Sequence, residues 1–395
     1  MKKSLLTMVA VVLCLCMFAG CSTDAPSGGG TQTDAETASN EVFKIGATGP
    51  LTGGAAIYGI AAKQGAELAA AEINALGGLQ FEINYQDDEH DAEKAVNAYN
   101  ALQDWGMQIF LSSVTSTPAV ATAVEAFEDR VFGLTPSASS TAVLEGNDNI
   151  YQMCFADPNQ GSATAQYVAD NYPEAVVAVI YKNDDVYSKG VYDTFAAAAK
   201  ELELNIVSET TFTEDSQQDF SVQIADAQNA GADFVFLPMY YQPASLIFAQ
   251  ANAVGYNPTY FGIDGMDGIL TLEGFDTSLA EGVMLLTPFS ADAQDDKTVN
   301  FVTKYQEQYG ETPNQFAADG YDCVYAIYEA IQSSDGAITV DMEAPAICEE
   351  LIAIFNGGFS FDGVTGAGMT WNENGEVSKS PTAVVIQDGV YVGVK

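Results

Sequence analysis

The feature that most constrains this chain is an alternation of short β-branched runs with longer amphipathic runs. The first series starts at residue 42. It predicts strands at residues 42–48, 79–86, 107–111 and 131–134, and helices at 58–76, 92–104 and 118–129. Strands that alternate with helices form parallel, doubly wound sheets covered by helices on both faces. The first third of the chain is therefore expected to form one α/β lobe.

A second series of the same kind begins near residue 158. It predicts helices at residues 158–171, 188–202, 217–229 and 243–254, and strands at 175–181, 204–211, 233–237, 259–263 and 282–286. Further helices are expected at residues 298–309, 316–331 and 345–355, followed by short strands. A chain of 395 residues is long enough for about two domains. We therefore predict two α/β lobes.

The charge balance excludes whole classes of partner. The chain has 13 Lys and Arg against 54 Asp and Glu, a formal net charge of −41. Nucleic acids and anionic lipid surfaces require clustered cations, so neither is expected as a partner. The single histidine, His90, cannot build a multi-histidine metal centre, and no G-x-S-x-G motif is present. We expect no metal, no cofactor and no enzymatic activity.

The first 20 residues have the features of a signal peptide. Lys2 and Lys3 precede an uncharged, mostly apolar run at residues 5–19 that is too short to span a bilayer comfortably. The segment Phe18-Ala19-Gly20-Cys21 resembles the lipobox of bacterial lipoproteins. We expect cleavage before Cys21, lipidation of Cys21, a flexible linker over residues 21–41 and an extracytoplasmic location on the cell membrane.

Three cysteines remain in the predicted folded region: Cys154, Cys323 and Cys348. Two of them could form a disulfide, but buried free thiols are the more common state of such residues. The run from Asp87 to Asp91, which includes His90, has metal-ligating side chains. Adjacent residues cannot all face one ion, so we interpret this run as an acidic, solvated loop.

Two hydroxyl-rich loops follow strands at the same expected sheet edge, at residues 112–118 and 135–140. Ligands of parallel sheets bind at the carboxyl ends of the strands. Thr117 is expected to cap the following helix and Pro118 to take its first position. Free N–H groups at a helix start, beside hydroxyl groups, favour an anion. Ordinary helix capping is the alternative for either loop alone.

An ordered set of short motifs carries a family resemblance. They are Gly49-Pro50-Leu51-Thr52-Gly53, Tyr58-Gly59, Ile73-Asn74-Ala75 with Gly77-Gly78, Asp87-Asp88, Thr135-Pro136-Ser137-Ala138-Ser139, and Tyr260-Phe261-Gly262 to Gly265. Together they resemble the leucine/isoleucine/valine-binding protein family, the extracytoplasmic substrate-binding proteins of ABC importers. The resemblance runs from about Val42 to Val394.

The resemblance implies a type I periplasmic binding protein fold, in which two Rossmann-like lobes are joined by a three-crossing hinge. The crossings are expected near residues 157–158, 287–288 and 365–369. The N-terminal lobe would comprise residues 42–157 plus 288–366, and the C-terminal lobe residues 158–287 plus 367–395. The final strands are expected to complete the C-terminal lobe.

The resemblance also implies site residues. The ligand carboxylate would bind Ser116, Ser137, Ser139 and the backbone of Ala138, and the ligand ammonium would bind Asp264. Aromatic walls would come from Tyr58, Tyr187, Tyr240 and Phe316. Some relatives carry a disulfide at the positions held here by His90 and Thr115, so no disulfide is expected across these loops.

These inferences favour a monomeric, lipid-anchored receptor that performs no chemistry. It would capture an amino acid, with a branched-chain or other apolar one expected, and deliver it to a membrane permease driven by a separate ATPase. Within the binding class, the alternatives are a sensor that signals ligand occupancy and a receptor for amides or other small polar solutes. A surface-anchored enzyme is the alternative from another class.

Overall fold

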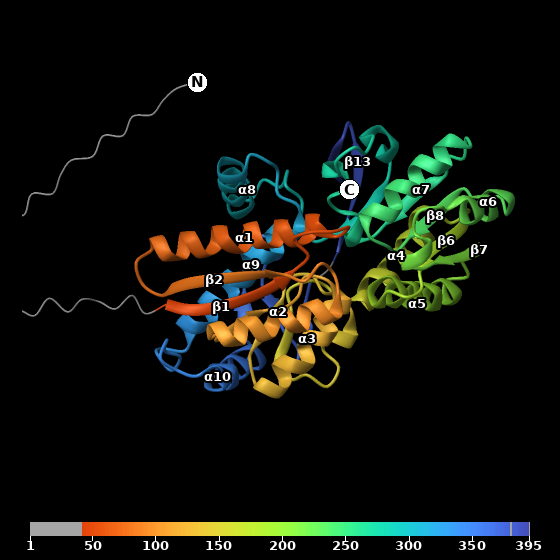
Figure 1. Ribbon diagram of the computed structural model, residues 1–395. Helices are drawn as coiled ribbons and strands as arrows, with labels where there is room; N and C mark the ends of the chain where they lie inside the picture. Colours follow the sequence, from red (N-terminus) through yellow and green to blue (C-terminus); the bar gives the residue numbers. More distant parts are fainter. Residues whose placement is uncertain (1–41, 380, 395) are drawn as a thin grey trace, which may run out of the picture. The chain divides into compact units, whose positions relative to one another are not determined.

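In the computed structural model, which describes residues 42–379 and 381–394, the first series forms a five-stranded parallel sheet (Figure 1). Its order is β2-β1-β3-β4-β5, so strands are added on both sides of β1, as in doubly wound sheets. The strands are β1 (Val42–Gly49), β2 (Gln80–Asp87), β3 (Ile109–Leu111), β4 (Gly133–Thr135) and β5 (Ile150–Gln152). The predicted signal peptide, Cys21 and the linker to residue 41 lie outside the described residues.

Six helices accompany this sheet, three from the first series and three from the late part of the chain, and the earliest of the late helices packs on two other helices. They are α1 (Ala56–Ala75), α2 (Ala92–Trp105), α3 (Ser116–Asp129), α8 (Asp296–Tyr309), α9 (Gln315–Ser333) and α10 (Ala344–Asn356). Helices α1 and α9 touch through glycines. A Cβ on Gly65 would lie 1.9 Å from the Ala317 carbonyl oxygen, and one on Gly320 would lie 2.3 Å from that of Ala62. This close approach joins distant parts of the sequence.

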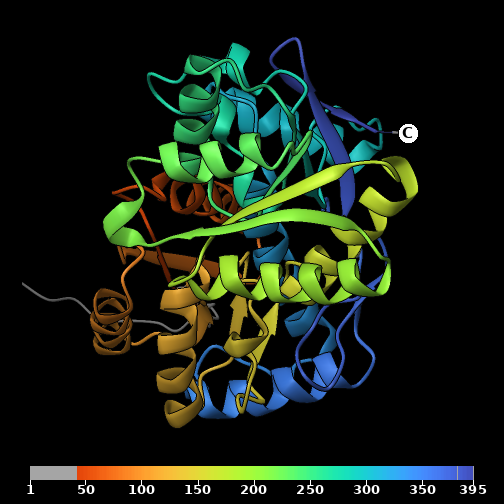
Figure 2. The ribbon, with the colours of Figure 1, turned by 90° about the vertical axis from the view of Figure 1, so that its right-hand side faces the viewer.

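The second sheet has seven strands in the order β14-β13-β10-β9-β8-β6-β7. Its parallel strands are β6 (Val176–Lys182), β7 (Asn205–Phe212), β8 (Phe234–Leu237), β9 (Thr259–Gly262) and β10 (Met284–Thr287). Strands β13 (Thr382–Gln387) and β14 (Val390–Gly393) join it as an antiparallel hairpin. The predictions of two doubly wound lobes, and of final strands that complete the second, are confirmed. In Figure 2 the parallel strands of this sheet are coloured from yellow-green to teal and its β13–β14 hairpin is dark blue.

The helices of the second series are α4 (Asp157–Asn171), α5 (Val186–Glu201), α6 (Ser221–Asn229) and α7 (Tyr241–Ala253). The predicted helix at residues 217–229 is too long. A separate 3₁₀ turn at Glu214–Ser216 precedes a shorter α6, and Thr213 with Ser216 caps that turn. No helix in the described part of the chain combines the length and the apolar character needed to cross a bilayer.

Contacts of the late segment bear on where the chain last crosses between the lobes. A short hairpin pairs β11 (Ser360–Phe361) with β12 (Met369–Thr370), and the indole N–H of Trp371 donates to the carbonyl oxygen of Gln152 in β5 at 2.7 Å. The ammonium of Lys379 lies 3.0 Å from a carboxylate oxygen of Asp319 in α9, with both side chains buried. These contacts favour a third crossing near residue 381 rather than near 365–369. The lobe boundaries as a whole stay a prediction.

The three cysteines of the described chain are free and buried. Cys323 and Cys348 belong to the largest apolar core, and Cys154 follows β5. The expectation of buried free thiols is confirmed.

Candidate functional site

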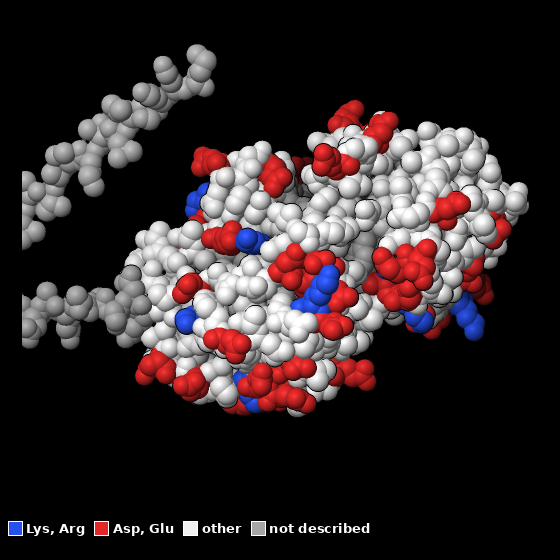
Figure 3. Space-filling model, in the orientation of Figure 1, with Lys and Arg blue, Asp and Glu red and all other residues white. Residues whose placement is uncertain are grey.

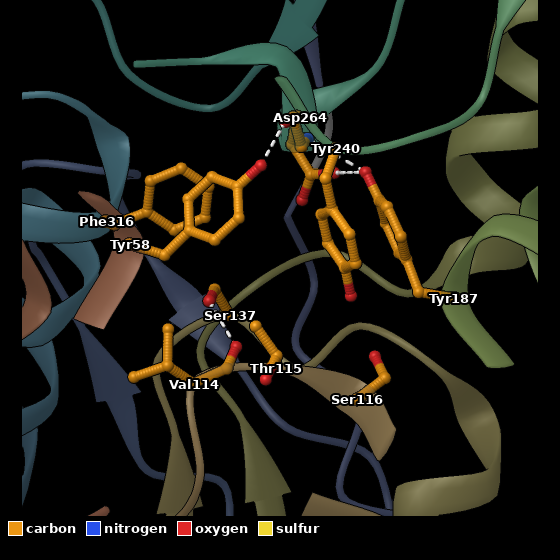
Figure 4. Close-up of a pocket in the computed structure, with 10 residues that line it drawn as sticks. Tyr58, Val114, Thr115, Ser116, Ser137, Tyr187, Tyr240, Asp264 and Phe316 are labelled. Atoms are coloured by element: carbon orange, nitrogen blue, oxygen red, sulfur yellow. Dashed lines mark hydrogen bonds between the residues drawn. The ribbon is translucent and has the colours of Figure 1, made fainter. Parts of the chain in front are cut away.

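A small cavity lies where loops after strands of the two sheets face one another (Figure 4). Its lining residues are Tyr58, Val114, Thr115, Ser116, Ser137, Tyr187, Tyr240, Asp264, Gly265 and Phe316. Seven of the nine ligand-binding residues expected from the sequence are in this set. Ala138 and Ser139 are buried nearby but do not line the cavity. Val114, Thr115 and Gly265 were not expected there.

The N-terminus of α3 forms one end of the cavity. The predicted cap is wrong: Thr115, in extended conformation, is the N-cap residue, Ser116 is the first helical residue and Thr117 is the second. The Thr115 hydroxyl does not cap the helix, because it hydrogen-bonds Nδ1 of His90 at 2.8 Å. The first-turn N–H groups of a helix point outward and carry a partial positive charge. With no capping side chain, this helix end is suited to an anion.

Hydroxyl groups lie beside this helix end. The Ser116 hydroxyl oxygen accepts from the Ser140 N–H at 3.2 Å, so its own proton remains available to a ligand. The Ser137 hydroxyl instead donates to the Val114 carbonyl oxygen at 2.7 Å. The Ala138 N–H, which the resemblance assigns to the carboxylate, already donates to the Thr135 hydroxyl at 3.0 Å.

Asp264 forms the opposite end of the cavity. It directly follows β9 and Ile263 and begins a 3₁₀ turn, Asp264–Met266. One carboxylate oxygen accepts from the Tyr187 hydroxyl at 2.5 Å, and that hydroxyl accepts from the Gly265 N–H at 2.8 Å. Burial raises the pKa of Asp264 to about 7, although the hydrogen bond from Tyr187 opposes the shift. A buried carboxylate without a cation in contact is suited to a cationic group.

Two aromatic pairs form the side walls, as Figure 4 shows. The rings of Tyr58 and Phe316 are 4.4 Å apart, and those of Tyr187 and Tyr240 stack at 4.9 Å with an interplanar angle of 13°. The Tyr58 hydroxyl donates to the Gly265 carbonyl oxygen and accepts from the Tyr241 N–H at 3.1 Å. It therefore ties α1 of the first lobe to two loops of the second. About 10 Å³ of space remains, roughly the volume that one water molecule requires.

Asp157 is a nearby carboxyl group that the sequence analysis treated as part of a crossing rather than of a site. It begins α4 and is 2% exposed. The Ser139 and Ser140 hydroxyls lie close enough to lower its pKa, but neither carboxylate oxygen makes a hydrogen bond of good geometry to the described residues. Burial raises its pKa well above the usual range, and the charge of Asp264 adds to this shift. From the same helix, Gln160 accepts from the Asp264 N–H at 3.4 Å. The sequence feature that could have indicated Asp157 as a site residue is its position directly before Pro158 at a predicted crossing between the lobes.

His90 lies at the edge of the site, between the lobes. Its Nδ1 bonds to Thr115, as described above, and its Nε2 lies 3.9 Å from a carboxylate oxygen of Asp185 in the second lobe. Asp185 also caps α5 by accepting from the Ser188 N–H at 2.8 Å. The two positions where some relatives carry a disulfide are thus neighbours here, joined by a hydrogen bond.

The acidic run from Asp87 to Asp91 is not simply solvated. Asp88 is fully buried and accepts from the His90 N–H at 2.9 Å, while Asp87 accepts from the Leu51 N–H at 2.8 Å. These carboxylates stabilise turns of the loop, and the interpretation of a solvated loop is wrong for Asp88, whereas Asp87 stays partly exposed. In the described chain, no group of three or more His, Cys, Asp or Glu side chains is arranged to hold a metal ion.

The model of a known protein family matches most of the chain. The model of the family described as "Periplasmic binding protein" matches residues 42–389. Among curated proteins, the chain is 25% identical to the leucine-, isoleucine-, valine-, threonine- and alanine-binding protein of Pseudomonas aeruginosa, over 82% of this chain and 86% of that protein. It is 30% identical to Leu/Ile/Val-binding protein homolog 3 of Brucella melitensis over a shorter stretch, 56% of this chain and 61% of that protein.

A solved structure shares the arrangement of both lobes. It is the branched-chain amino acid transporter substrate-binding protein LivJ from Streptococcus pneumoniae, in complex with isoleucine. The TM-score is 0.79 at 26% sequence identity, with 89% of this chain and 97% of that chain covered.

Proposed function

Because this chain belongs to the periplasmic binding protein family and has its type I fold, we propose that it is a solute-binding protein that captures an amino acid between its two lobes. The observation that carries the proposal is the opposed polarity of one cavity. An uncapped helix N-terminus with the Ser116 hydroxyl forms one end, and the Asp264 carboxylate forms the other. A free amino acid is a zwitterion, so it presents one charge to each end.

The walls between the two ends favour an apolar side chain. Tyr58, Phe316, Tyr187 and Tyr240 surround the space, and among the described residues that line it Asp264 is the charged one. Aromatic rings bind apolar groups by removing them from water. The names of the Pseudomonas relative and of the isoleucine complex agree with a branched-chain or similarly apolar amino acid.

Each end of the cavity is proposed to bind one charged group of the amino acid. The α3 N-terminus, Ser116 and Ser137 would hold the carboxylate, and Asp264 the ammonium. Ser139 remains a proposed carboxylate ligand that needs a local rearrangement, since it does not line the cavity. Ser137 would first have to release its hydroxyl proton from the Val114 carbonyl oxygen, and Ala138 its N–H from Thr135.

Binding requires the lobes to move. A space of about 10 Å³ cannot hold an amino acid, and Tyr58 hydrogen-bonds across the lobes. Entry would therefore follow opening about the crossings, and closure would bury the ligand. This is the hinge motion expected of a receptor that must both capture and release its cargo.

The family and the sequence support a proposed location and proposed partners. We place the protein outside the cytoplasm, anchored through a lipid on Cys21 and acting as a monomer that delivers its ligand to an ABC permease with its ATPase. The acidic groups spread over the face shown in Figure 3 support the exclusion of nucleic acid. No catalytic role is assigned to any residue.

The test is thermal unfolding of the protein, stripped of bound ligand, against each of the twenty amino acids. A ligand at a hundred times its Kd stabilises the fold by about 2.7 kcal/mol and raises the unfolding midpoint by several degrees. We expect this shift with leucine, isoleucine or valine, and none with aspartate, whose side-chain charge would meet aromatic walls. No shift with any amino acid would overturn the proposal.

One observation keeps a second candidate open. With a pKa of about 7, Asp264 is protonated in a large fraction of molecules at neutral pH, and a protonated carboxyl can donate to a neutral group. A receptor for amides or other small polar solutes, in a transport or sensing role, would use Asp264 in this form. A ligand that binds more tightly as the pH falls below 7 would favour this candidate.

A further inference from the structure

A second, larger cavity of about 580 Å³ is lined by residues of the second sheet and of helix α8. We call it the α8 cavity. Its lining residues are Asp267, Gly268, Leu270, Thr271, Leu285, Thr287, Phe289, Ser290, Ala291, Asp292, Val302, Gln306, Thr312, Pro313, Asn314, Val384 and Gly389 to Val392. They come from the turn after β9, from β10, from the β13–β14 hairpin, and from α8 with the loop that follows it. A volume of this size is typical of small-molecule sites.

The walls of the α8 cavity are mainly apolar and well supported. Leu285 and Val384 are at most 1% exposed, and Phe289 is 6% exposed, so their positions are fixed by the core behind them. Val302 on α8 forms the facing wall. An apolar molecule placed here would remove these side chains from water, which is favourable by about 25 cal/mol for each Å² covered.

A buried carboxylate stands at one side of these walls. Asp267 is 4% exposed, and one of its oxygens accepts from the Gln315 N–H at 2.9 Å. The other oxygen, Oδ1, is buried and has no hydrogen-bond partner among the described residues. The nearby Tyr391 hydroxyl accepts from the Gly268 N–H at 3.1 Å. It lies close enough to Asp267 to lower the pKa of that carboxyl against the effect of burial, but its geometry does not give Oδ1 a hydrogen bond. A buried acceptor left in this state is costly unless a ligand or a water donates to it.

The charged residues around the α8 cavity favour a cationic ligand over an anionic one. Besides Asp267, the charged residue in the described lining is Asp292, which is exposed at the rim. No Lys or Arg is found among the described residues that line it. An anion would meet two carboxylates and no counter-ion, whereas an ammonium group would complete the hydrogen bonding of Asp267.

We propose that the α8 cavity binds a small organic cation with an apolar body, its ammonium group on Asp267 and its apolar part between Val302 and the Leu285–Val384 wall. This site is separate from the amino acid cavity, because Asp264 lines that cavity and Asp267 lines this one. The proposal goes beyond the proposed function and does not depend on it.

The test is isothermal titration calorimetry at pH 8 with 4-phenylbutylamine and, as its charge-reversed counterpart, 4-phenylbutyrate. Both carry the same phenyl group on a short alkyl chain. We expect the amine to bind with a stoichiometry of one at micromolar to millimolar concentration and the carboxylate not to bind. Asp267→Asn keeps an oxygen for the Gln315 N–H but removes the charge, and should weaken amine binding by about tenfold or more.

Two further variants locate the amine. Val302→Trp should fill the cavity and abolish amine binding, whereas Val299→Trp, at an exposed position of α8 outside the lining, should not. Asp264→Ala should leave amine binding intact. Thermal unfolding of each variant checks that it is folded.

Several outcomes would overturn the proposal. They are equal binding of amine and carboxylate, unchanged amine binding in a folded Asp267→Asn or Val302→Trp variant, loss of amine binding in Asp264→Ala, and absence of amine binding to the unaltered protein. The third result would show that the amine occupies the amino acid cavity instead.

Discussion

Asp264 and Asp267 lie in one short turn after β9, yet they line two different cavities. The cavity of Asp264 is narrow, polar at both ends and walled by four aromatic rings. The cavity of Asp267 is large, mainly apolar and charged at one side. Both carboxylates are buried, and burial raises their pKa values to about 7 and about 6. Two aspartates of one turn therefore differ in the ligand that each can bind, because different groups face them across the two cavities.

The sharpest way to break this comparison is to remove Asp264. In Asp264→Ala the ligand ammonium would be buried without its counter-ion, which costs about 2–5 kcal/mol. We expect the Kd for isoleucine to rise by about a hundredfold in calorimetric titration. Glu273→Ala removes an exposed carboxylate nearby and serves as the control. Equal affinity of Asp264→Ala and the unaltered protein would show that the ammonium assignment is wrong.

The pH dependence of amino acid binding tests the charge of Asp264. Its pKa of about 7 means that the carboxyl must lose a proton before it can pair with an ammonium group. Isoleucine affinity should therefore rise as the pH increases, by up to about tenfold per unit below pH 7, and level off above it. A Kd measured from pH 5.5 to 8 that does not change, or that increases, would contradict this account.

Stability should follow the opposite trend in the unliganded protein. The pKa of Asp in an unfolded chain is about 3.9, so the folded chain binds more protons than the unfolded chain between about pH 4 and pH 7. The contribution of Asp264 and Asp267 to the free energy of unfolding therefore decreases as the pH rises through this window. Urea unfolding at pH 5 and pH 8 should show a smaller decrease in Asp264→Asn than in the unaltered protein.

Substitutions at the carboxylate-binding end of the amino acid cavity should reduce affinity less than substitution of Asp264 does. Ser116→Ala removes one hydroxyl donor to a carboxylate, which is worth about 1.5–3 kcal/mol, so we expect affinity to fall by about tenfold to about a hundredfold. Ser139→Ala should change the Kd less, because Ser139 does not line the cavity. If Ser139→Ala had the larger effect, the loop at residues 135–140 would have to rearrange on binding.

The smallest expected effect comes from the contact between the lobes. Tyr58→Phe keeps the ring wall but removes the hydroxyl that contacts Gly265 and Tyr241. We expect a change in affinity of a few fold, and a more open unliganded state with a larger radius of gyration in X-ray scattering. An unchanged radius of gyration would show that this hydroxyl does not hold the lobes together.

The sequence by itself determined the order and type of the elements, because hydrophobic periodicity and strand propensity act over a few residues. It also placed Ser116 and Asp264 in loops after strands, where parallel sheets present their ligand sites. The family resemblance supplied their roles and the aromatic walls. Strand β5 was not predicted, although it is as long as β3 and β4, which were.

The assembled fold determines which side chains are buried and which groups they contact. It turned the Thr115 hydroxyl away from its helix toward His90, and left Asp157 without a hydrogen bond of good geometry. It buried Asp88 and opened an apolar space beside Asp267. These features join residues that are far apart in the chain or depend on packing from several elements at once. Burial and distance are properties of the assembled fold, so no local pattern of residues encodes them.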